Sequence, residues 1–452
     1  MEFEVSYTLE NEQQFWDELD DIVSAHCETH ELIDNTLRSY LHFTTNYKGE
    51  YIQTEYGIAR CSYKLLESAL FAAHKDYIRR QIVYSLLQED SADTLHFIIA
   101  FLLYDGRQNE ITLEMMNEEG AFPRLVELIQ ERKDDETGLH RMQLELLYEM
   151  SRIQRLRLED LMLIEDEFII YMFDIIEGLS DDVNDPYHYP VIRVLLVLNE
   201  QYMVFAHDPG PGQSPTTQLT NKVIKMLSLY GSACKTFGEN IILLLNRESE
   251  TSLQLLILKL LYLLFTTPPT YEYFYTNDLR VLVDVMIRNL LDLPLSATAL
   301  RHTYLRVLYP LLANTQLQQP PHYKRDELLR LLSMMTSDGG GMTHFGAVDE
   351  TTKRLVARCV KVKWLAEDIE AAAVASGNET VAKKLLGVEL PVAMASSLSV
   401  VEVAAHKEKP GVQTPSRRED SMREGKDGLR LSTTAKDGLG AEKSPFEVEG
   451  EA

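Results

Sequence analysis

Basic residues are the first shortage in this sequence. Its 452 residues include 44 Lys and Arg against 70 Asp and Glu, which gives a formal net charge of -26. Nucleic-acid phosphates are bound by clustered Lys and Arg, so this composition argues against a nucleic-acid-binding protein. It argues equally against adsorption to an anionic membrane surface.

Long hydrophobic runs are also missing. The densest apolar run, LQLLILKLLYLLF at residues 253–265, is shorter than the roughly 20 residues of a membrane-spanning helix, and Lys259 interrupts it. The opening residues MEFEVSYTLENEQ are acidic and contain no apolar stretch typical of a secretory signal. We therefore expect a cytoplasmic protein without membrane insertion.

Cysteine is scarce, and no metal motif accompanies it. The cysteines lie far apart and form no CxxC pair: Cys27, Cys61, Cys234 and Cys359. This spacing predicts reduced, mostly buried thiols. HCETH places His26 and His30 four residues apart, as on one helix face, but a zinc site needs further ligands. Ordinary helix residues are the simpler interpretation, and we predict no bound metal.

Signatures of enzymes are absent as well. The glycine-rich SDGGGMTHFG at residues 337–346 matches neither GxGxxG nor GxxxxGK[ST], and there is no GxSxG motif and no kinase signature set. We predict no catalytic residues, no cofactor and no enzymatic activity. The function should lie in surfaces that bind other proteins.

What the sequence does contain is helical periodicity, from about residue 13 to residue 386. NEEGAFPRLVELI at 117–129 and YTNDLRVLVDVMI at 275–287 share one layout, and each precedes a second apolar helix. Repeats of about 40 residues predict an all-α, armadillo- or HEAT-like solenoid, with a non-repetitive helical bundle as the alternative. The apolar segments at 191–198 and 253–265 would then be helices sandwiched between neighbours.

The composition changes near the C-terminus. After about Pro391, Ser, Lys, Glu, Gly and Ala dominate and aromatic residues almost vanish. Such a segment cannot bury enough apolar surface to offset its chain entropy. We predict an armadillo-like helical repeat domain at residues 1–389 and a disordered low-complexity tail at 390–452.

A polar trio, Asn199-Glu200-Gln201, follows the apolar segment 191–198. On a helix, Arg193, Val197 and Glu200 share one stripe, so Arg193 and Glu200 are expected to form a polar seam. One interpretation is a buried network that bonds to nearby loops, since buried polar groups need hydrogen bonds. The other is the wall of a groove that binds a partner.

The segment ALRHTYLRVLYPLL at 299–312 predicts a second candidate surface. Its core stripe is expected to contain Leu300, Tyr304, Val307, Leu308 and Leu311. A second stripe combines His302, Arg306 and Tyr309, with Arg301 beside it, and Tyr and Arg are common in binding hot spots. An ordinary solvated face is the alternative. Pro310 should end or kink the helix near Tyr309.

A basic stripe in TTKRLVARCVKVKW, residues 351–364, is the third candidate. Leu355, Cys359 and Val362 are expected to face inward. Arg354, Arg358 and Lys361 form a basic stripe of about two turns on the other face, with Lys353 and Lys363 nearby. An acidic partner would be steered to this cluster. The alternative is a favourable interaction of cations with a helix C-terminus, but that effect is confined to the last turn.

VLLVLNEQYMV, LRHTYLRVLYPLL and TTKRLVARCVKVKWL together resemble the leucine-rich domain of the WISH/DIP/SPIN family, most closely its fungal branch with the low-dye-binding proteins. The resemblance covers roughly residues 10–386. It implies an armadillo-like solenoid that binds the actin-related protein 2/3 complex and activates it without a preformed filament. The linear filaments so made would seed cortical, endocytic actin patches.

From these patterns we expect the partner-binding residues to be Asn199, Glu200, Gln201, Arg301, His302, Arg306, Lys353, Arg354, Arg358 and Lys361. The resemblance makes the actin-related protein 2/3 complex the direct partner and actin an indirect one, with endocytic adaptor proteins as further partners. The competing hypothesis is a helical-repeat scaffold or cargo adaptor in endocytic membrane traffic that does not nucleate actin directly.

Overall fold

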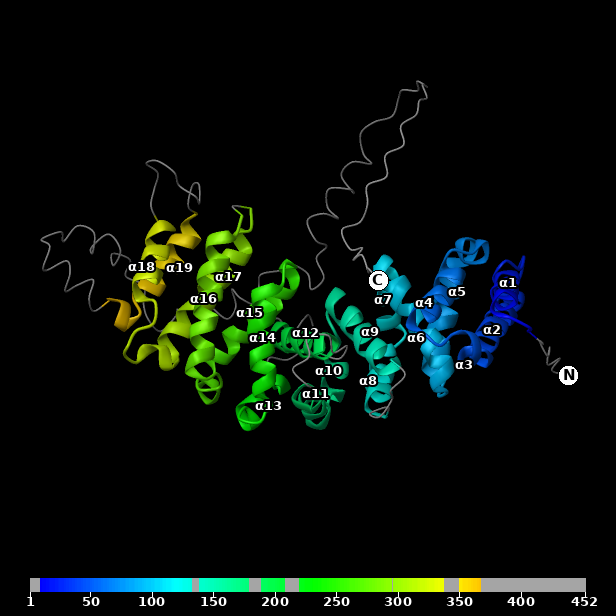
Figure 1. The fold of residues 1–452 in the computed structure, drawn as a ribbon, viewed down its shortest axis with the longest axis horizontal. Coiled ribbons are helices and arrows are strands. Elements are labelled where there is room, and N and C mark those ends of the chain that lie inside the picture. The colour runs from blue at the N-terminus through cyan, green and yellow to red at the C-terminus, as the bar shows by residue number, and fades with distance from the viewer. Residues whose placement is uncertain are drawn as a thin grey trace, which may run out of the picture. The chain divides into compact units, whose positions relative to one another are not determined.

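The computed structural model describes residues 9–131, 138–178, 188–207, 219–294, 296–336 and 349–366, and these ranges contain helices and no strand. The predicted all-α class is confirmed (Figure 1). The predicted tail, the loop at 337–346 and the predicted domain boundary lie outside these ranges. The helices are α1 (Glu12–Val23), α2 (His30–Asn46), α3 (Lys48–Tyr51), α4 (Glu55–Leu66), α5 (Ala69–Gln88), α6 (Ala92–Gln108), α7 (Glu110–Glu118), α8 (Ala121–Glu131), α9 (Leu139–Ile153), α10 (Leu158–Leu163), α11 (Asp166–Gly178), α12 (His188–His207), α13 (Lys222–Tyr230), α14 (Lys235–Arg247), α15 (Thr251–Thr266), α16 (Thr276–Asp292), α17 (Thr298–Asn314), α18 (Arg325–Met334) and α19 (Glu350–Val360), with short 3-10 helices at Pro268–Thr270 and Gln316–Gln318.

Six of these helices form a continuous series, which we call the ladder helices: α6, α9, α12, α15, α17 and α19. Each packs against the next one in the series. They begin at residues 92, 139, 188, 251, 298 and 350, so one follows another about every 50 residues. This regular packing fits the predicted solenoid, in which each unit contacts mainly its neighbours.

The two segments of the predicted repeat occupy matching positions. Residues 117–129 lead into α8, which packs on ladder helix α9, and residues 275–287 lead into α16, which packs on ladder helix α17. Each pair therefore consists of an outer helix and the ladder helix that follows it in sequence. The shared layout in the sequence reflects this shared packing.

The two apolar segments that the sequence predicts to be sandwiched between neighbours lie in α12 and α15, and both are largely buried. The apolar side chains of residues 191–198 in α12 are at most 1% exposed, and those of residues 255–258 in α15 are at most 4% exposed. Both helices lie between two other ladder helices, so no side of them meets only solvent. Burial on this scale supplies the main driving force for folding.

Pro310 does not end α17, contrary to one of the two outcomes predicted for it. The helix continues to Asn314 with Pro310 buried inside it. Leu311 and Leu312, which follow the proline, are completely buried. Their burial offsets the missing backbone hydrogen bond, whose loss in a helix interior costs about 3 kcal/mol.

Candidate partner-binding surface

The trio Asn199-Glu200-Gln201 lies inside α12 with at most 2% of each residue exposed. Gln201 connects α12 to the last turn of α9 and to the segment that follows it. Its Oε1 accepts a hydrogen bond from the Leu156 amide at 3.0 Å, and its Nε2 donates to the carbonyls of Ser151 at 2.7 Å and Gln154 at 2.9 Å. This is the loop-bonding network that one interpretation of the sequence predicts.

The other two members of the trio contact two further helices. Glu200 accepts a hydrogen bond from Nζ of Lys259 on α15, and both side chains are 3% exposed. Asn199 Oδ1 accepts from Nδ2 of Asn221 at 2.9 Å, and Asn221 in turn caps the N-terminus of α13. The trio therefore connects α12 to three neighbouring segments at one level of the ladder.

The expected seam between Arg193 and Glu200 does not form. Glu200 pairs with Lys259 instead, and Val197, which shares the stripe, is completely buried. The guanidinium of Arg193 lies over two aromatic rings, at 5.6 Å from the ring centre of Tyr148 and 5.7 Å from that of Tyr189. The position of α15 decides this outcome, because it places a lysine against Glu200.

The core stripe that the sequence predicts on α17 is confirmed. The second stripe was expected to be exposed, but its arginine Arg306 and the neighbouring Arg301 are buried. Arg301 is 5% exposed and Arg306 is 3% exposed. Nη2 of Arg301 donates to the backbone carbonyls of Leu293 at 3.3 Å and Pro294 at 3.0 Å, and burial lowers the pKa of this arginine. Arg301 is thus held against the segment that precedes α17, and α17 itself packs between α15 and α19.

His302 lies where α17 meets the beginning of α19. Its Nε2 is 3.0 Å from Oδ1 of Asp349 and 3.1 Å from Oγ1 of Thr352. Asp349 is the N-cap of α19 and accepts hydrogen bonds from the amide and hydroxyl of Thr352, at 2.9 and 2.6 Å. His302 thus helps to attach α19 to the preceding ladder helix.

The basic residues of α19 have different exposures. Arg354 and Lys361 are exposed, whereas Lys353 and Arg358 are half-buried. The guanidinium of Arg358 lies 4.2 Å from the ring centre of Tyr309 on α17. Leu355, Cys359 and Val362 are buried, as predicted. The basic stripe and Tyr309 therefore belong to one surface that spans the last two ladder helices.

Acid should weaken the Asp349 cap in a defined pH range. Burial raises the pKa of this carboxyl, but hydrogen bonds from Thr352 and His302 outweigh it and lower the pKa from 3.8 to about 2. A lowered pKa in the folded state means that the charged carboxyl stabilises the fold above about pH 4, and that this contribution is lost as the pH falls through 2.

The measurement is urea unfolding of the wild type and the Asp349→Asn variant at several pH values. Asparagine is also a good N-cap, but it does not titrate. We expect the wild type to be the more stable protein above pH 4 and its advantage to shrink between pH 4 and 2. An advantage independent of pH would contradict the assignment.

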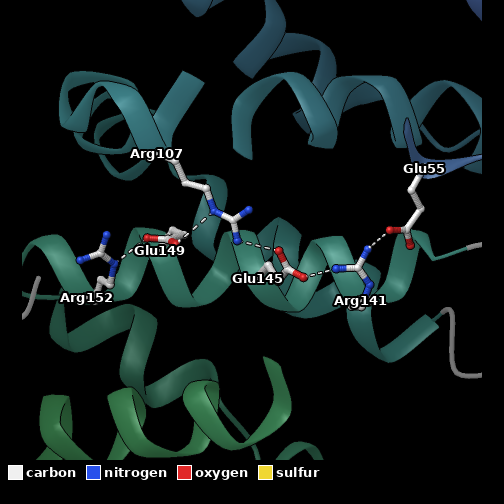
Figure 2. A network of polar contacts seen from close by, with 6 residues as sticks. All are labelled: Glu55, Arg107, Arg141, Glu145, Glu149 and Arg152. Carbon is white, nitrogen blue, oxygen red and sulfur yellow. Dashed lines mark hydrogen bonds and ion pairs between the residues drawn. The ribbon is translucent and has the colours of Figure 1, made fainter. Parts of the chain in front are cut away.

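A charged network along α9 was not predicted from the sequence (Figure 2). Arg141 pairs with Glu55 of α4 at 2.5 Å and with Glu145. Arg107 of α6 contacts Glu145 at 2.6 Å and Glu149 at 3.3 Å. Arg152 completes the series by pairing with Glu149 at 2.5 Å. The helical spacings of 141/145 and 149/152 were the available signal, since such pairs share a helix face.

The histidines of HCETH do not form a metal site. His26 is in the segment before α2, with its side chain 86% exposed, and His30 stacks on Tyr77 with a ring-centre distance of 4.0 Å. Over the described residues, no group of His, Cys, Asp or Glu is arranged to hold a metal ion. None of the described helices combines the length and apolar character needed to cross a membrane.

The four cysteines are buried free thiols, which confirms the prediction from their spacing. Burial raises the pKa of Cys61 and Cys359 to about 12 and that of Cys234 to about 11. Thiols with such pKa values remain protonated at neutral pH and are poor nucleophiles.

Comparison with known proteins assigns the family. Residues 184–328, from just before α12 to the first turn of α18, match the family model described as SPIN90/Ldb17, leucine-rich domain. Protein dip1 of Schizosaccharomyces pombe is 32% identical over 375 residues, which cover 82% of this chain and 98% of dip1. The chain belongs to the SPIN90/Ldb17 family.

Two further members of the SPIN90/Ldb17 family show lower identity. Protein LDB17 of Saccharomyces cerevisiae is 29% identical over 414 residues, which cover 80% of this chain and 82% of that protein. Protein LDB17 of Eremothecium gossypii is 29% identical over 354 residues, which cover 72% of this chain and 75% of that protein. The region matched by the SPIN90/Ldb17 model contains the trio, Lys259, Arg193 and all of α17.

Proposed function

We propose that this chain is a non-enzymatic activator of the actin-related protein 2/3 complex. It would bind the arrangement in which the two actin-related subunits imitate a filament end better than the inactive arrangement. Such differential affinity shifts the population towards the active state without making or breaking a bond. The product would be a linear filament, made without a preformed one, that seeds cortical and endocytic actin patches.

The observation that carries this proposal is the similarity to dip1 over 98% of that protein's length. The ladder helices support it, because consecutive units present one long surface to a large partner. Such a series of packed helices suits a protein that acts by binding.

The decisive experiment is fluorescence microscopy of actin assembly with the purified chain and the actin-related protein 2/3 complex, without preformed filaments. We expect new unbranched filaments only when both components are present. Branched filaments, or no increase in nucleation by a folded chain with the complex from a matched species, would contradict the proposal. Absence of stimulation would favour a helical-repeat scaffold or cargo adaptor in endocytic traffic.

We also propose that the complex contacts the surface of α17 and α19. The direct contacts would come from Lys353, Arg354, Arg358 and Lys361. The buried members of the predicted set would have an indirect role, which is to hold in position the helices that form this and neighbouring surfaces: Asn199, Glu200, Gln201, Arg301 and Arg306. His302 would hold α19 in place through Asp349.

Charge reversal tests this surface. The double variant Arg354→Glu with Arg358→Glu should weaken binding at least about tenfold at low salt, mainly through slower association, and the difference should shrink at high salt. The variant should remain folded, because losing the contact of Arg358 with Tyr309 costs only about 0.5–1 kcal/mol.

The matched control is Arg38→Glu with Arg247→Glu, which reverses two exposed arginines on α2 and α14. Both double variants change the net charge equally, so non-specific electrostatics would affect them alike. Equal binding by the two variants, each folded, would remove α19 from the proposed contact surface. Surface plasmon resonance at two ionic strengths provides the association and dissociation rates.

A further inference from the structure

Arg193 on α12 differs from the other arginines of the neighbouring ladder helices. It is half-buried between the rings of Tyr148 on α9 and Tyr189 on its own helix, at 5.6 and 5.7 Å from their centres. Its Nε is buried without a hydrogen-bond partner, and no described residue forms an ion pair with it. A buried donor without an acceptor lowers the stability of the fold, so its presence needs an explanation.

Neighbouring charges are already engaged with one another. Arg107, Arg141 and Arg152 each pair with a carboxylate of the network along α9 (Figure 2). Glu250, which is close enough to act electrostatically on Tyr148, accepts a hydrogen bond from Ser252. Among the described residues, none accepts a hydrogen bond from Nε of Arg193, whose guanidinium lies over two aromatic rings.

The geometry defines the chemistry of a ligand that would fit. Aromatic rings interact with the face of a guanidinium, which leaves the donors at its edge for hydrogen bonding. The planar set of N–H donors matches the two oxygens of a carboxylate. Tyr189 is 37% exposed, so the cluster reaches the surface, and Arg with Tyr is a composition enriched in binding hot spots.

We propose that Arg193, held between Tyr148 and Tyr189, binds a carboxylate side chain of the partner complex. The inference rests on the proposed function, because that function identifies the partner as the actin-related protein 2/3 complex. It adds a second contact, on the third ladder helix, to the basic surface of α17 and α19. Both contacts place an acidic group of the partner against arginine.

The test compares full-length wild type with Arg193→Met for binding to the purified complex. Methionine retains an aliphatic side chain between the two rings and removes the donors and the charge. We expect about 10- to 30-fold weaker binding, seen mostly as faster dissociation, as is typical for truncating a buried charged contact. The control is Arg247→Met, which removes an exposed arginine on α14 and should leave binding unchanged.

Arg193→Lys serves as a second variant in case methionine disturbs packing. It retains the charge but lacks the planar donors, so we expect an intermediate loss that a purely structural role would not produce. Equal binding by wild type and a folded Arg193→Met variant would overturn the inference while the proposed function stands. No binding by the wild type would overturn both.

Tighter binding by Arg193→Met would overturn the inference in a different way. It would mean that Arg193 normally holds an acidic segment of this chain, which competes with the partner. Circular dichroism and thermal unfolding of each variant establish that the binding differences arise in folded protein.

Discussion

Replacing Lys259 with methionine should lower the free energy of unfolding by about 3–5 kcal/mol, because the variant leaves the Glu200 carboxylate buried without its partner. Both side chains are 3% exposed; Lys259 donates to Oε1 of Glu200, and Oε2 has no hydrogen-bond partner. The carboxylate would therefore lose its ion pair and could not regain water without opening the contact between α12 and α15.

The double variant Glu200→Leu with Lys259→Met removes both charges, so it distinguishes the cost of an unpaired buried carboxylate from the loss of the ion pair itself. Replacing a buried ion pair by apolar residues of similar volume is often neutral or stabilising, by about 1–4 kcal/mol. We therefore expect the double variant to recover most of the loss seen in Lys259→Met alone. Urea unfolding followed by circular dichroism measures both. Equal stability of the single and double variants would contradict the role assigned to this pair.

The same double variant addresses why the ion pair is there. The pair joins α12 to α15 within residues 184–328, the region that matches the family model. If its role is to fix the register of these two ladder helices, and if the proposed function holds, the apolar double variant should be stable yet activate the actin-related protein 2/3 complex less well. Unchanged activation would show that apolar packing alone sets the register.

The sequence was sufficient for the features that depend on neighbouring residues. The apolar runs at 191–198 and 253–265 predicted buried helices, and both are buried between ladder helices. The core stripes of α17 and α19 followed from their spacing in the same way. In each case the periodicity of one segment contains the information, because a helix must bury its apolar face whatever covers it.

Features that depend on distant residues could not be predicted. In the sequence, Lys259 was only an interruption of an apolar run. The packing of α15 against α12 shows that it forms an ion pair with Glu200. Arg306 was expected on an open stripe, but it is 3% exposed on a helix that packs against both α15 and α19. A helical pattern shows which face is polar, and it does not show which later helix lies against that face.

Asp105 leads to the second large expected effect, in the first part of the chain. It is 2% exposed and accepts two hydrogen bonds from Arg79 of α5, from Nε at 2.7 Å and from Nη2 at 2.9 Å. Thr112 of α7 donates its hydroxyl to the same carboxylate. Asp105 thus joins α5, α6 and α7, and its hydrogen bonds raise the pKa of Arg79.

Asp105→Ala should cost about 3–5 kcal/mol of unfolding free energy, because it leaves a guanidinium that is 4% exposed without its buried partner. Thr112→Val removes one hydrogen bond and retains the ion pair, so we expect a cost of about 0.5–1.5 kcal/mol. Asp76→Ala is the matched control, since Asp76 also contacts Arg79, at 3.5 Å, with its side chain 85% exposed. An exposed pair contributes at most about 1 kcal/mol.

The order of these costs is the critical result, because it depends on burial and not on the removal of a negative charge. Asp105→Ala and Asp76→Ala change the net charge equally and both act on Arg79, so a general electrostatic effect would make them alike. Urea unfolding of the three single variants provides the comparison. If Asp76→Ala were as costly as Asp105→Ala, the contribution of Arg79 to the free energy of unfolding would come from surface charge. The buried junction of α5, α6 and α7 would then be stabilised by apolar packing alone.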